Sequence, residues 1–398
     1  MSKLDELIWE LCPNGVEYKK IKDVFQRLKG TPITAAKMKE IASDSGEVRV
    51  FAGGKTVINA NEEDIPNANI IRVPAVLVQS RGVIDVIFYE KPFTFKNEMW
   101  AYTSSERTSV KFLYYILKNN IQSFRDAASG MGSLPQISLP VTEEFSIPVP
   151  PLEVQREIVR ILDNFTELTA ELTAELTAEL TARKRQYEFY RDKLLTAPQG
   201  SQEKKFDDLF EFQNGFAFKS SLFKKSGCPI LRITNIQERR IDTEKMAYFS
   251  PDDYKENLQA FTVLPGDIVV AMSGATTGKI GVNHTDKVYY LNQRVGKFSP
   301  KTGIDKRYLY HLLLQNSNKL LEISVGSGAQ PNLSSEKMKK LTARVPGLSE
   351  QKRIATILDK LDTLCNDISE GLPAEIGARQ KQYEYYRGKL LTFKELEG

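Results

Sequence analysis

Residues 149–163 read VPPLEVQREIVRILD, and residues 345–359 read VPGLSEQKRIATILD. The two stretches match at an offset of 196 positions, and the same offset aligns ARKRQYEFYRDKLLT at 182–196 with ARQKQYEYYRGKLLT at 378–392. Each copy begins after prolines, is rich in helix-forming residues and places apolar residues at helical spacing. Each copy is about 45 residues long, and a helix of that length would measure about 65 Å, which exceeds the diameter of a typical domain. The sequence therefore predicts two copies of one long helix, packed on each other or on a partner.

A low-complexity tract lies between the matched ends of the first copy, where Thr-Ala-Glu-Leu occurs three times over residues 169–180. An apolar stripe with a four-residue period is shared by both copies and consists of Leu168, Leu172, Leu176 and Leu180, and of Leu364, Ile368, Leu372 and Ile376. A four-residue period drifts by about 40° per repeat around a helix, which favours a short antiparallel pair over a long conventional seam. Pro373 predicts that the second helix is bent or split near residues 370–374.

The helices divide the remaining sequence into two regions with short β-branched runs, such as residues 48–51, 70–73 and 267–272. An amphipathic helix is predicted near the end of each region, at 110–124 and 306–323. We predict an α+β fold in which two strand-rich domains alternate with two long helices that pair as an antiparallel coiled coil, with a pseudo-two-fold internal repeat. The predicted boundaries are 1–148, 149–196, 197–344 and 345–398.

The two domains also resemble each other. SGMGSLPQI at 129–137 matches VGSGAQPNL at 325–333, again at an offset of 196. QSRG at 79–82 is expected to occupy the place of MSGA at 272–275, and Asn97-Glu98 that of Asn292-Gln293. Close duplication of the helices with loose duplication of the domains is expected when one scaffold displays two surfaces that recognise different targets.

Composition indicates an ordinary globular protein, with 41% hydrophobic and 27% charged residues. The formal net charge is +4; residues 197–344 carry 22 basic and 15 acidic side chains, so this region is the better candidate to bind a polyanion. The three cysteines lie far apart, which favours a reduced, cytoplasmic setting. No apolar run approaches a membrane span and no secretory signal is recognisable, so no membrane partner is expected.

Catalytic and metal-binding patterns were sought without success. The stretch 274–280 has three residues between its glycines instead of the four of a phosphate-binding loop, and Ile280 replaces the Ser or Thr that would contact magnesium. Gly54-Lys55-Thr56 lacks the first glycine, because Arg49 stands there. His284 and His311 are isolated, which disfavours a catalytic triad or a metal centre. We expect neither a catalytic site nor a cofactor in this chain.

Loops rich in Ser, Gly, Thr and Asn, with Arg and Lys among them, are compatible with DNA binding. Glycine lets backbone N–H groups approach phosphates, and Arg pairs with guanine as Asn and Gln pair with adenine in the major groove. Each residue alone is equally compatible with an ordinary turn, but such loops recur at matching places in both domains. The DNA-binding candidates are Arg49, Ser80, Arg81, Asn97, Ser133, Gln136, Arg232, Asn235, Ser273, Thr276, Thr277, Lys279, Asn292, Gln293, Arg294, Gln330 and Asn332.

The whole pattern resembles the specificity subunits of type I restriction–modification systems, in the subclass with Thr-Ala-Glu-Leu repeats. The resemblance rests on the duplicated motifs that open and close the helices and on the tandem repeat. It implies that each domain reads one half of a bipartite, asymmetric site in double-stranded DNA, and that the helices set the spacer between the halves.

The resemblance also implies partners. Two methylation subunits, which use S-adenosylmethionine to methylate adenine, would dock on the helices and recruit motor–nuclease subunits that use ATP and Mg²⁺. Candidates for docking are Gln155, Arg156, Tyr187, Tyr190, Arg191, Gln351, Lys352, Tyr383, Tyr386 and Arg387. Two alternatives stay open at this point: a self-sufficient DNA methyltransferase, and a helical scaffold protein that does not bind nucleic acid.

Overall fold

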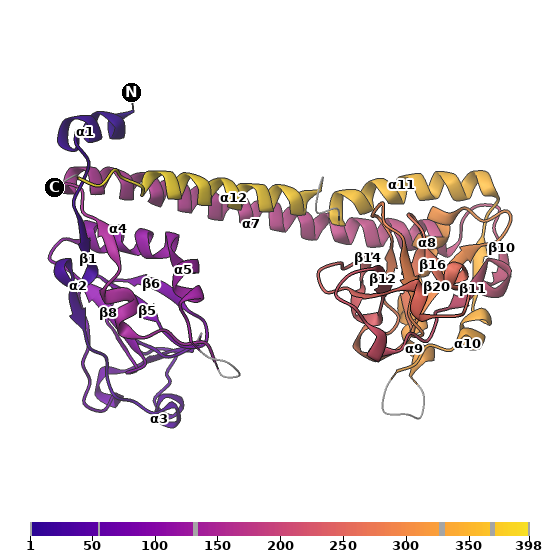
Figure 1. Cartoon of the computed structure of the whole chain (residues 1–398), viewed down its shortest axis with the longest axis horizontal. Coiled ribbons are helices and arrows are strands. Elements are labelled where there is room, and N and C mark those ends of the chain that lie inside the picture. Colours follow the sequence, from indigo (N-terminus) through magenta and orange to yellow (C-terminus); the bar gives the residue numbers. More distant parts are fainter. Residues whose placement is uncertain (1, 55, 130–133, 326–330, 367–370, 397–398) are drawn as a thin grey trace. The chain divides into compact units, whose positions relative to one another are not determined.

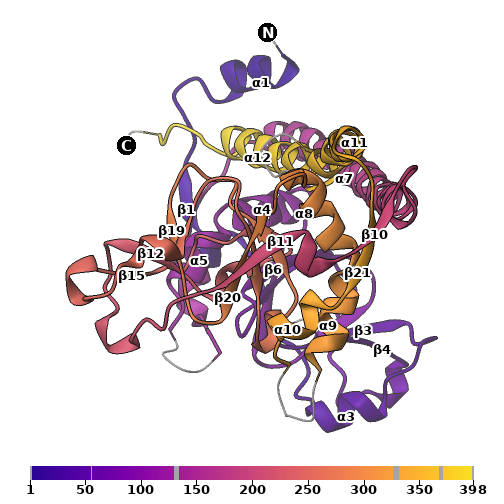
Figure 2. The same ribbon diagram turned by 90° about the vertical axis from the view of Figure 1, so that its right-hand side faces the viewer.

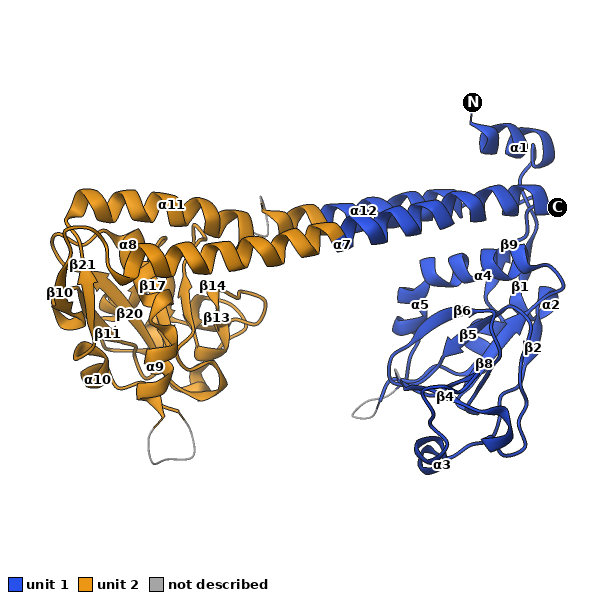
Figure 3. Cartoon of the chain, turned by 180° about the vertical axis from the view of Figure 1, so that it is seen from behind, with its two compact units in different colours: residues 1–174, 377–398 blue, residues 175–376 orange. Residues whose placement is uncertain are grey.

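The computed structural model describes residues 2–54, 56–129, 134–325, 331–366 and 371–396. Contacts divide the chain into two compact units, residues 1–174 with 377–398, and residues 175–376 (Figure 3). The longest helix, α7 (Leu152–Thr196), is uninterrupted and contributes its first part to unit 1 and its second part to unit 2. No described helix is long and apolar enough to cross a membrane.

Unit 1 contains a four-stranded antiparallel sheet in the order β2-β8-β5-β6, a three-stranded sheet in the order β4-β3-β7, and the pair β1-β9 (Figure 1). Besides the first part of α7 and the end of α12, its elements are α1 (Lys3–Leu11), β1 (Tyr18–Lys20), α2 (Ile21–Val24), β2 (Gln26–Leu28), α3 (Ala35–Glu40), β3 (Val48–Phe51), β4 (Val57–Ala60), η1 (Glu62–Asp64), β5 (Ala75–Gln79), β6 (Asp85–Tyr89), β7 (Phe93–Phe95), β8 (Met99–Thr103), α4 (Arg107–Asn119), α5 (Ile121–Asp126), α6 (Leu139–Glu143) and β9 (Ser146–Pro148).

Unit 2 contains a six-stranded sheet in the order β11-β20-β17-β18-β14-β13, a four-stranded sheet in the order β15-β12-β19-β16, and the pair β10-β21. Its elements after α7 are β10 (Gln202–Lys205), η2 (Phe206–Asp208), β11 (Phe210–Asn214), η3 (Ser220–Leu222), β12 (Cys228–Leu231), η4 (Ile233–Asn235), β13 (Ile236–Gln237), β14 (Arg239–Ile241), β15 (Ala247–Phe249), η5 (Pro251–Asp253), η6 (Leu258–Phe261), β16 (Thr262–Val263), β17 (Ile268–Ala271), η7 (Gly274–Thr276), β18 (Ile280–Val282), β19 (Tyr289–Leu291), β20 (Val295–Pro300), α8 (Lys306–Gln315), α9 (Ser317–Ser324), α10 (Ser335–Lys339), β21 (Thr342–Val345) and α11 (Leu348–Asn366).

The internal topology of the two units matches strand for strand. The order β2-β8-β5-β6 in unit 1 corresponds to β11-β20-β17-β18 in unit 2. In the second sheet, β3 pairs in parallel with β7, and β12 pairs in parallel with β19. The predicted α+β fold with a duplicated strand-rich domain is therefore confirmed. Among the described residues, unit 2 differs in two places. The hairpin β13–β14 extends its large sheet beyond β18, and β16 adds a strand to its second sheet, where unit 1 has only the bridge between Ile71 and Phe93.

The amphipathic helices predicted near the end of each domain are each broken in the structure. α4 gives way to α5 at Asn120, and α8 gives way to α9 at Asn316, which lies 196 positions later. Both asparagine amides donate to the carbonyl four residues earlier, that of Ile116 at 2.9 Å and that of Leu312 at 2.8 Å. Each of these carbonyls also accepts from the backbone N–H of the same asparagine, at 3.1 and 3.2 Å. The break is thus a duplicated feature that the periodicity did not reveal.

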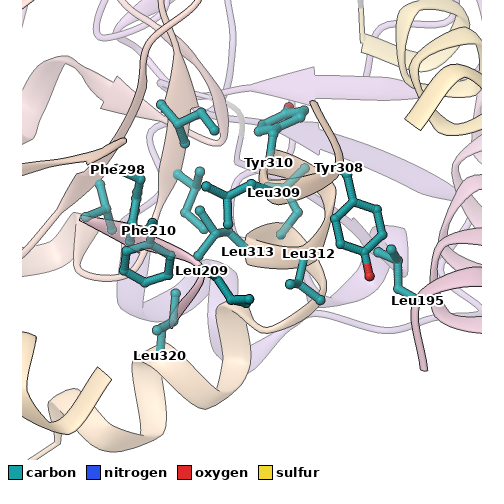
Figure 4. Close-up of a cluster of buried hydrophobic side chains, with 14 of the residues drawn as sticks. Leu195, Leu209, Phe210, Phe298, Tyr308, Leu309, Tyr310, Leu312, Leu313 and Leu320 are labelled. Carbon is teal, nitrogen blue, oxygen red and sulfur yellow. The ribbon is translucent and has the colours of Figure 1, made fainter. Parts of the chain in front are cut away.

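The core of unit 2 forms where α8 packs between the large sheet and the long helices. All residues from Tyr308 to Leu314 are buried, because α8 contacts β20 on one side and α11 on the other (Figures 2 and 4). Leu209, Phe210 and Phe298 come from the adjoining turn and sheet and are fully buried in the same cluster (Figure 4). In unit 1, α4 packs in the same way on β5 and β6, and its Lys111 pairs with Asp163 of α7 at 2.9 Å.

The second long helical segment is split, as Pro373 predicted. α11 ends at Asn366 and α12 (Leu372–Leu390) begins after the undescribed residues 367–370. Pro373 lies in the first turn of α12, where its missing N–H has no intrahelical partner to lose. The break thus precedes the proline instead of falling on it. One strand prediction was wrong: of residues 70–73, only Ile71 forms a bridge, to Phe93.

The helices pair antiparallel, and the apolar stripe is only partly inside their seam. In unit 1, Thr166 bonds to the Tyr383 hydroxyl at 2.9 Å, and the centre of the Phe165 ring lies 6.2 Å from that of Tyr386. The residue number in α7 decreases between these contacts while that in α12 increases, so the two helices run antiparallel. Leu176 and Leu372 are buried, and Leu172, Leu180 and Ile376 are half-buried. Leu168 is 60% exposed and Leu364 is 36% exposed, which corrects their assignment to the seam. The drift of a four-residue period carries the first residue of each copy of the stripe outward. Ile368 lies outside the described residues.

Candidate nucleic-acid interface and docking surface

Four loops meet at the end of the sheets in unit 1. Arg81 forms a bridge with Gln136, and the N–H of Ile137 donates to the Ser80 carbonyl at 2.9 Å. The Gln79 amide donates to the Gly54 carbonyl at 2.9 Å. We call this group, residues 52–54, 79–82, 96–98 and 134–137, loop cluster 1. Arg81, Asn97 and Gln136 are exposed on it, so three predicted DNA-binding side chains come together at one surface.

The equivalent loops meet in unit 2. Ser273 forms a bridge with Asn332, and the N–H of Leu333 donates to the Met272 carbonyl at 2.8 Å. The Arg294 guanidinium donates to the Asn332 side-chain oxygen at 3.1 Å. We call residues 232–235, 272–279, 292–294 and 331–333 loop cluster 2. Gln293, Arg294 and Asn332 are exposed on it, whereas Ser273, Thr276, Lys279 and Asn292 are half-buried.

The structure corrects the expected correspondence between the clusters by one residue. Ser80 and Met272 accept the equivalent hydrogen bonds from Ile137 and Leu333, so Ser80 matches Met272 and not Ser273. Gly82 and Gly274, each with a φ of +78°, then occupy the same left-handed position of the turn. By the same logic Asn97 matches Gln293, because the N–H groups of Met99 and Val295 close the same turn onto Lys96 and Asn292.

Several predicted DNA-binding residues are committed to the fold instead. Ser80, Asn235 and Thr277 are buried. The Ser80 hydroxyl donates to the Glu98 carbonyl, and the Asn235 amide donates to the carbonyls of Asp242 and Lys245. The Thr277 hydroxyl donates to the Gly274 carbonyl at 2.7 Å. A side chain that is buried with its hydrogen bonds satisfied cannot reach a base edge without losing them, so in this structure these three side chains stabilise the loops.

Four predicted DNA-binding residues remain, and the structure describes two of them. Arg232 is half-buried and donates to the Lys245 carbonyl at 3.0 Å. Arg49 is exposed in β3, two residues before that strand ends. Ser133 and Gln330 lie outside the described residues.

Glu98 is a polar residue of loop cluster 1 that the candidate set omitted. Burial raises its pKa, but hydrogen bonds from its own N–H and from Gly53, followed by Lys96, outweigh this and leave the pKa below its usual value. Glu98 is therefore an anion in the loop cluster. Its counterpart at an offset of 196 is Arg294, a cation. The offset of 196 could have identified Glu98, since Glu98 follows the candidate Asn97 as Arg294 follows the candidate Gln293.

The ends of the duplicated helices expose two matching groups of side chains. Phe189 and Tyr190 are 60% and 37% exposed, with ring centroids 5.4 Å apart, and the Lys193 amine lies 5.7 Å from the Phe189 ring centre. In the other copy, Tyr385 and Tyr386 are 62% and 43% exposed, also with centroids 5.4 Å apart, and the Lys389 amine lies 5.8 Å from the Tyr385 ring. We call these groups the aromatic–lysine patches. Phe189, Tyr385 and the lysines were not among the predicted docking residues, although the shared helical spacing contained them.

Other predicted docking residues divide into exposed and buried ones. Arg156 and Lys352 are exposed at equivalent places near the helix starts. Gln155 and Gln351 are buried, and their amides donate to the carbonyls of Pro150 and Pro346 at 2.7 and 2.9 Å. These glutamines close the first helical turn onto the preceding proline, which corrects their assignment to docking.

The tyrosine and arginine of each helix end also pack within the chain. Tyr187 is buried, and burial raises the pKa of its hydroxyl above the usual range. Tyr383 is half-buried, and the guanidinium groups of Arg191 and Arg387 stack on Tyr187 and Tyr383 at 5.7 and 5.3 Å. Tyr187 is therefore a packing residue, which corrects its assignment to docking. Arg191 and Arg387 are half-buried, so each stacks on a neighbouring ring and is also partly exposed at the surface.

A buried histidine forms hydrogen bonds within unit 2. His311 is buried between the Tyr187 hydroxyl at 3.0 Å and the Asp359 carboxylate at 2.8 Å. A cavity of about 340 Å³ beside it is lined by both cations and anions, among them Lys306, Arg307 and Asp359. Among the residues that the structure describes, no group of three or more His, Cys, Asp and Glu could hold a metal ion.

Comparison with known proteins gives a consistent result. The family model for the type I restriction modification DNA specificity domain matches residues 13–182 and again residues 198–378. The specificity subunit of the Escherichia coli type I restriction enzyme EcoR124I/EcoR124II is 33% identical over 371 residues, which cover 88% of this chain and 88% of that protein.

Solved structures share the fold. A chain from a study of assembly and conformational transition in a type I R-M system aligns with a TM-score of 0.62 and 14% identity, over 95% of this chain and 98% of that one. The S subunit of a type I restriction-modification system from M. genitalium aligns with a TM-score of 0.52 and 17% identity, over 95% of this chain and 96% of that one.

Proposed function

The chain belongs to the family of type I restriction–modification DNA specificity proteins, and from this premise we propose that it is the subunit that selects the DNA sequence for such a system. It has no catalytic role of its own. The recognition domains are residues 1–148 and 197–344, and residues 149–196 and 345–398 form the helical scaffold. The observation that carries the proposal is the recurrence of an exposed polar loop cluster at the same topological place in both units.

The chemistry of the loop clusters fits base recognition in the major groove. Arginine pairs with guanine through two donors, and asparagine or glutamine pairs with adenine through a donor and an acceptor. Loop cluster 1 offers Arg81, Asn97 and Gln136, and left-handed glycines keep its backbone close to an approaching surface. Lysines and arginines around the clusters would contact phosphates, which adds affinity without sequence preference.

The two clusters carry different side chains at equivalent positions, which supports an asymmetric site. Glu98 stands where Arg294 stands in the other unit. A carboxylate accepts from the amino group of cytosine, whereas a guanidinium donates to guanine. The exchange of an anion for a cation at one position reverses the preferred base, so the two domains read different half-sites.

The aromatic–lysine patches supply a docking surface with two equivalent places. Exposed aromatic side chains beside a cation are enriched where proteins bind other proteins. Their duplication supports two methylation subunits, one for each patch, with Arg156 and Lys352 near the opposite helix ends adding charge. S-adenosylmethionine would be bound by those partners, and ATP and Mg²⁺ by the motor–nuclease subunits that join them, in the cytoplasm of a prokaryotic cell.

Selection from a random duplex library by the chain in complex with its methylation subunits tests the proposal. We expect enrichment of one bipartite motif with a fixed gap. Arg81→Ala should relax the preference in one half only and Arg294→Ala in the other, whereas Arg72→Ala, outside both clusters, should change neither. Failure to enrich any sequence would support the non-DNA-binding scaffold. Methyl transfer by the purified chain alone would instead support the self-sufficient methyltransferase.

A further inference from the structure

The two copies of the joint between helix and recognition domain differ by a coordinated set of substitutions. In unit 1, the Tyr115 hydroxyl donates to Asp163 at 2.5 Å, and Thr166 bonds to Tyr383 at 2.9 Å. The residues 196 positions later are His311, Asp359 and Asp362, and the tyrosine that faces them is Tyr187. The first contact is retained as a side-chain hydrogen bond, in which the Nε2 of His311 and the acceptor oxygen of Asp359 lie 2.8 Å apart. The second contact does not: a carboxylate replaces the threonine hydroxyl.

Arg239 contacts both Asp362 and Tyr187, the two residues whose counterparts in unit 1 bond to each other directly. Its guanidinium forms an ion pair with Asp362 and lies 4.4 Å from the centre of the Tyr187 ring. The two charged side chains are only 13% and 15% exposed. Asp362 also accepts from the Tyr310 hydroxyl at 3.3 Å. Burial lowers the pKa of Arg239, but the charge of Asp362 outweighs burial and raises it, so the cation is held between an anion and a π-face.

Arg239 belongs to the hairpin β13–β14, which has no counterpart among the described residues of unit 1. Its φ of +71° lies in the left-handed region, which a non-glycine residue adopts only where its surroundings hold it there. Here the clamp on Tyr187 and Asp362 holds the side chain, while the backbone pairs with Gly281 of β18. A Cβ atom at position 281 would come within 2.8 Å of the Arg240 carbonyl, so the close approach of β14 requires glycine there.

The hairpin also supports loop cluster 2. The Lys279 amine donates to the Gln237 side-chain oxygen at 3.3 Å. Within loop cluster 2, the Thr276 hydroxyl donates to the Ile233 carbonyl at 3.0 Å, and residues 233–235 lead directly into β13. Glu238 and Arg240 stand on either side of Arg239 and are exposed. The hairpin therefore contacts the scaffold through Arg239 and loop cluster 2 through Gln237, and it exposes the charged residues Glu238 and Arg240.

We propose that the hairpin β13–β14 is a specificity element of the second recognition domain and that Arg239 is the positioning residue that fixes it to the scaffold. The inference rests on the proposed function, since it concerns how the second half-site is read. Discrimination at that half-site depends on the clamp between Arg239, Asp362 and Tyr187. Discrimination at the first half-site does not, because unit 1 has neither the hairpin nor the buried ion pair at the equivalent place.

The test uses the complex with methylation subunits and three duplexes: the motif selected by the wild-type complex, and the same duplex with either half-site scrambled. Binding ratios give the discrimination at each half. Arg239→Met, Asp362→Thr and Arg240→Ala should each reduce discrimination at the second half at least tenfold and leave the first half unchanged. Arg239→Lys, which keeps the charge but loses the planar group, should recover part of it. Lys111→Met, which breaks the Asp163 ion pair of unit 1, is the matched control and should leave the second half unchanged.

The double variant Arg239→Met with Asp362→Thr separates positioning from stability. It removes both buried charges together, so the thermal midpoint should return towards that of the wild type while discrimination at the second half stays low. Wild-type discrimination in this double variant, or in Arg240→Ala, would overturn the proposal, as would equal losses at both halves in the single variants. If the wild-type complex discriminates at neither half, that result contradicts the proposed function and not the role of the hairpin.

Discussion

Deletion of one Thr-Ala-Glu-Leu unit, residues 177–180, tests the role of α7 as a measure of length. α7 is continuous from Leu152 to Thr196, so the deletion removes four residues from an unbroken helix. Four residues correspond to about 6 Å of rise and about 400° of turn, a net rotation of about 40°. The sequence repeats every four residues here, so Leu176 takes the place of Leu180 after the deletion and the seam keeps its apolar pattern.

These magnitudes predict the change in the DNA site. B-form DNA rises about 3.4 Å per base pair. The rise of the deleted unit therefore lies between one and two base pairs. We expect the spacer to shorten by one to two base pairs, with both half-sites unchanged.

Methylome sequencing of a host that expresses the variant with its methylation subunits measures half-sites and spacer together. Glu179→Gln, which keeps the helix length, serves as the control and should leave the spacer unaltered. Altered half-sites at an unchanged spacer would refute the reasoning, because the length of α7 would then have no part in the distance between the half-sites.

Three further outcomes are expected. Leu358→Ala, at a fully buried position of α11, should cost about 2–5 kcal/mol in urea unfolding, whereas Leu364→Ala in the same helix, where the side chain is 36% exposed, should cost far less; equal costs would place Leu364 in the core after all. Replacing Phe189 and Tyr190 by serine should lower the number of bound methylation subunits from two to one in native mass spectrometry, and retention of two would exclude the patch as a docking place. Hydrogen bonds from two lysines on β1 and α2 lower the pKa of Glu144 to about 2. Its ion pairs therefore stabilise the fold above about pH 4.5 and lose effect as the pH falls towards 2. The difference in thermal midpoint between wild type and Glu144→Gln should shrink between pH 6 and pH 3, and a constant difference would contradict this.

The sequence predicted the helices well because their duplication is ungapped. A constant offset of 196 aligned both ends of the scaffold. The four-residue stripe marked the seam only in part, because Leu168 and Leu364 were predicted to pair and are exposed. Pro373 marked the break in the second helix, although the break itself precedes the proline. These features are local, so periodicity and single breakers suffice to find them.

The recognition domains were less predictable because their equivalence is spatial. Ser80 corresponds to Met272, at an offset of 192, while β8 and β20 keep the offset of 196. Such a change of spacing within a loop cannot be located by residue identity alone. The hairpin around Arg239 consists of strands of two and three residues that pair with a distant strand, so no periodic signal announces it. Ser80, Asn235 and Thr277 have the polarity of DNA-binding residues, and only their burial reveals that they build the loops.

The most direct test of the central claim is single-molecule methylome sequencing of a methylation-deficient host that expresses this chain with its methylation subunits. We predict one methylated adenine motif made of two different half-sites separated by a gap of fixed length. Arg81→Ala should relax one half of that motif and Arg294→Ala the other. A contiguous motif without a gap, or a motif that stays the same in both variants, would contradict the account that two loop clusters on one scaffold select the DNA site.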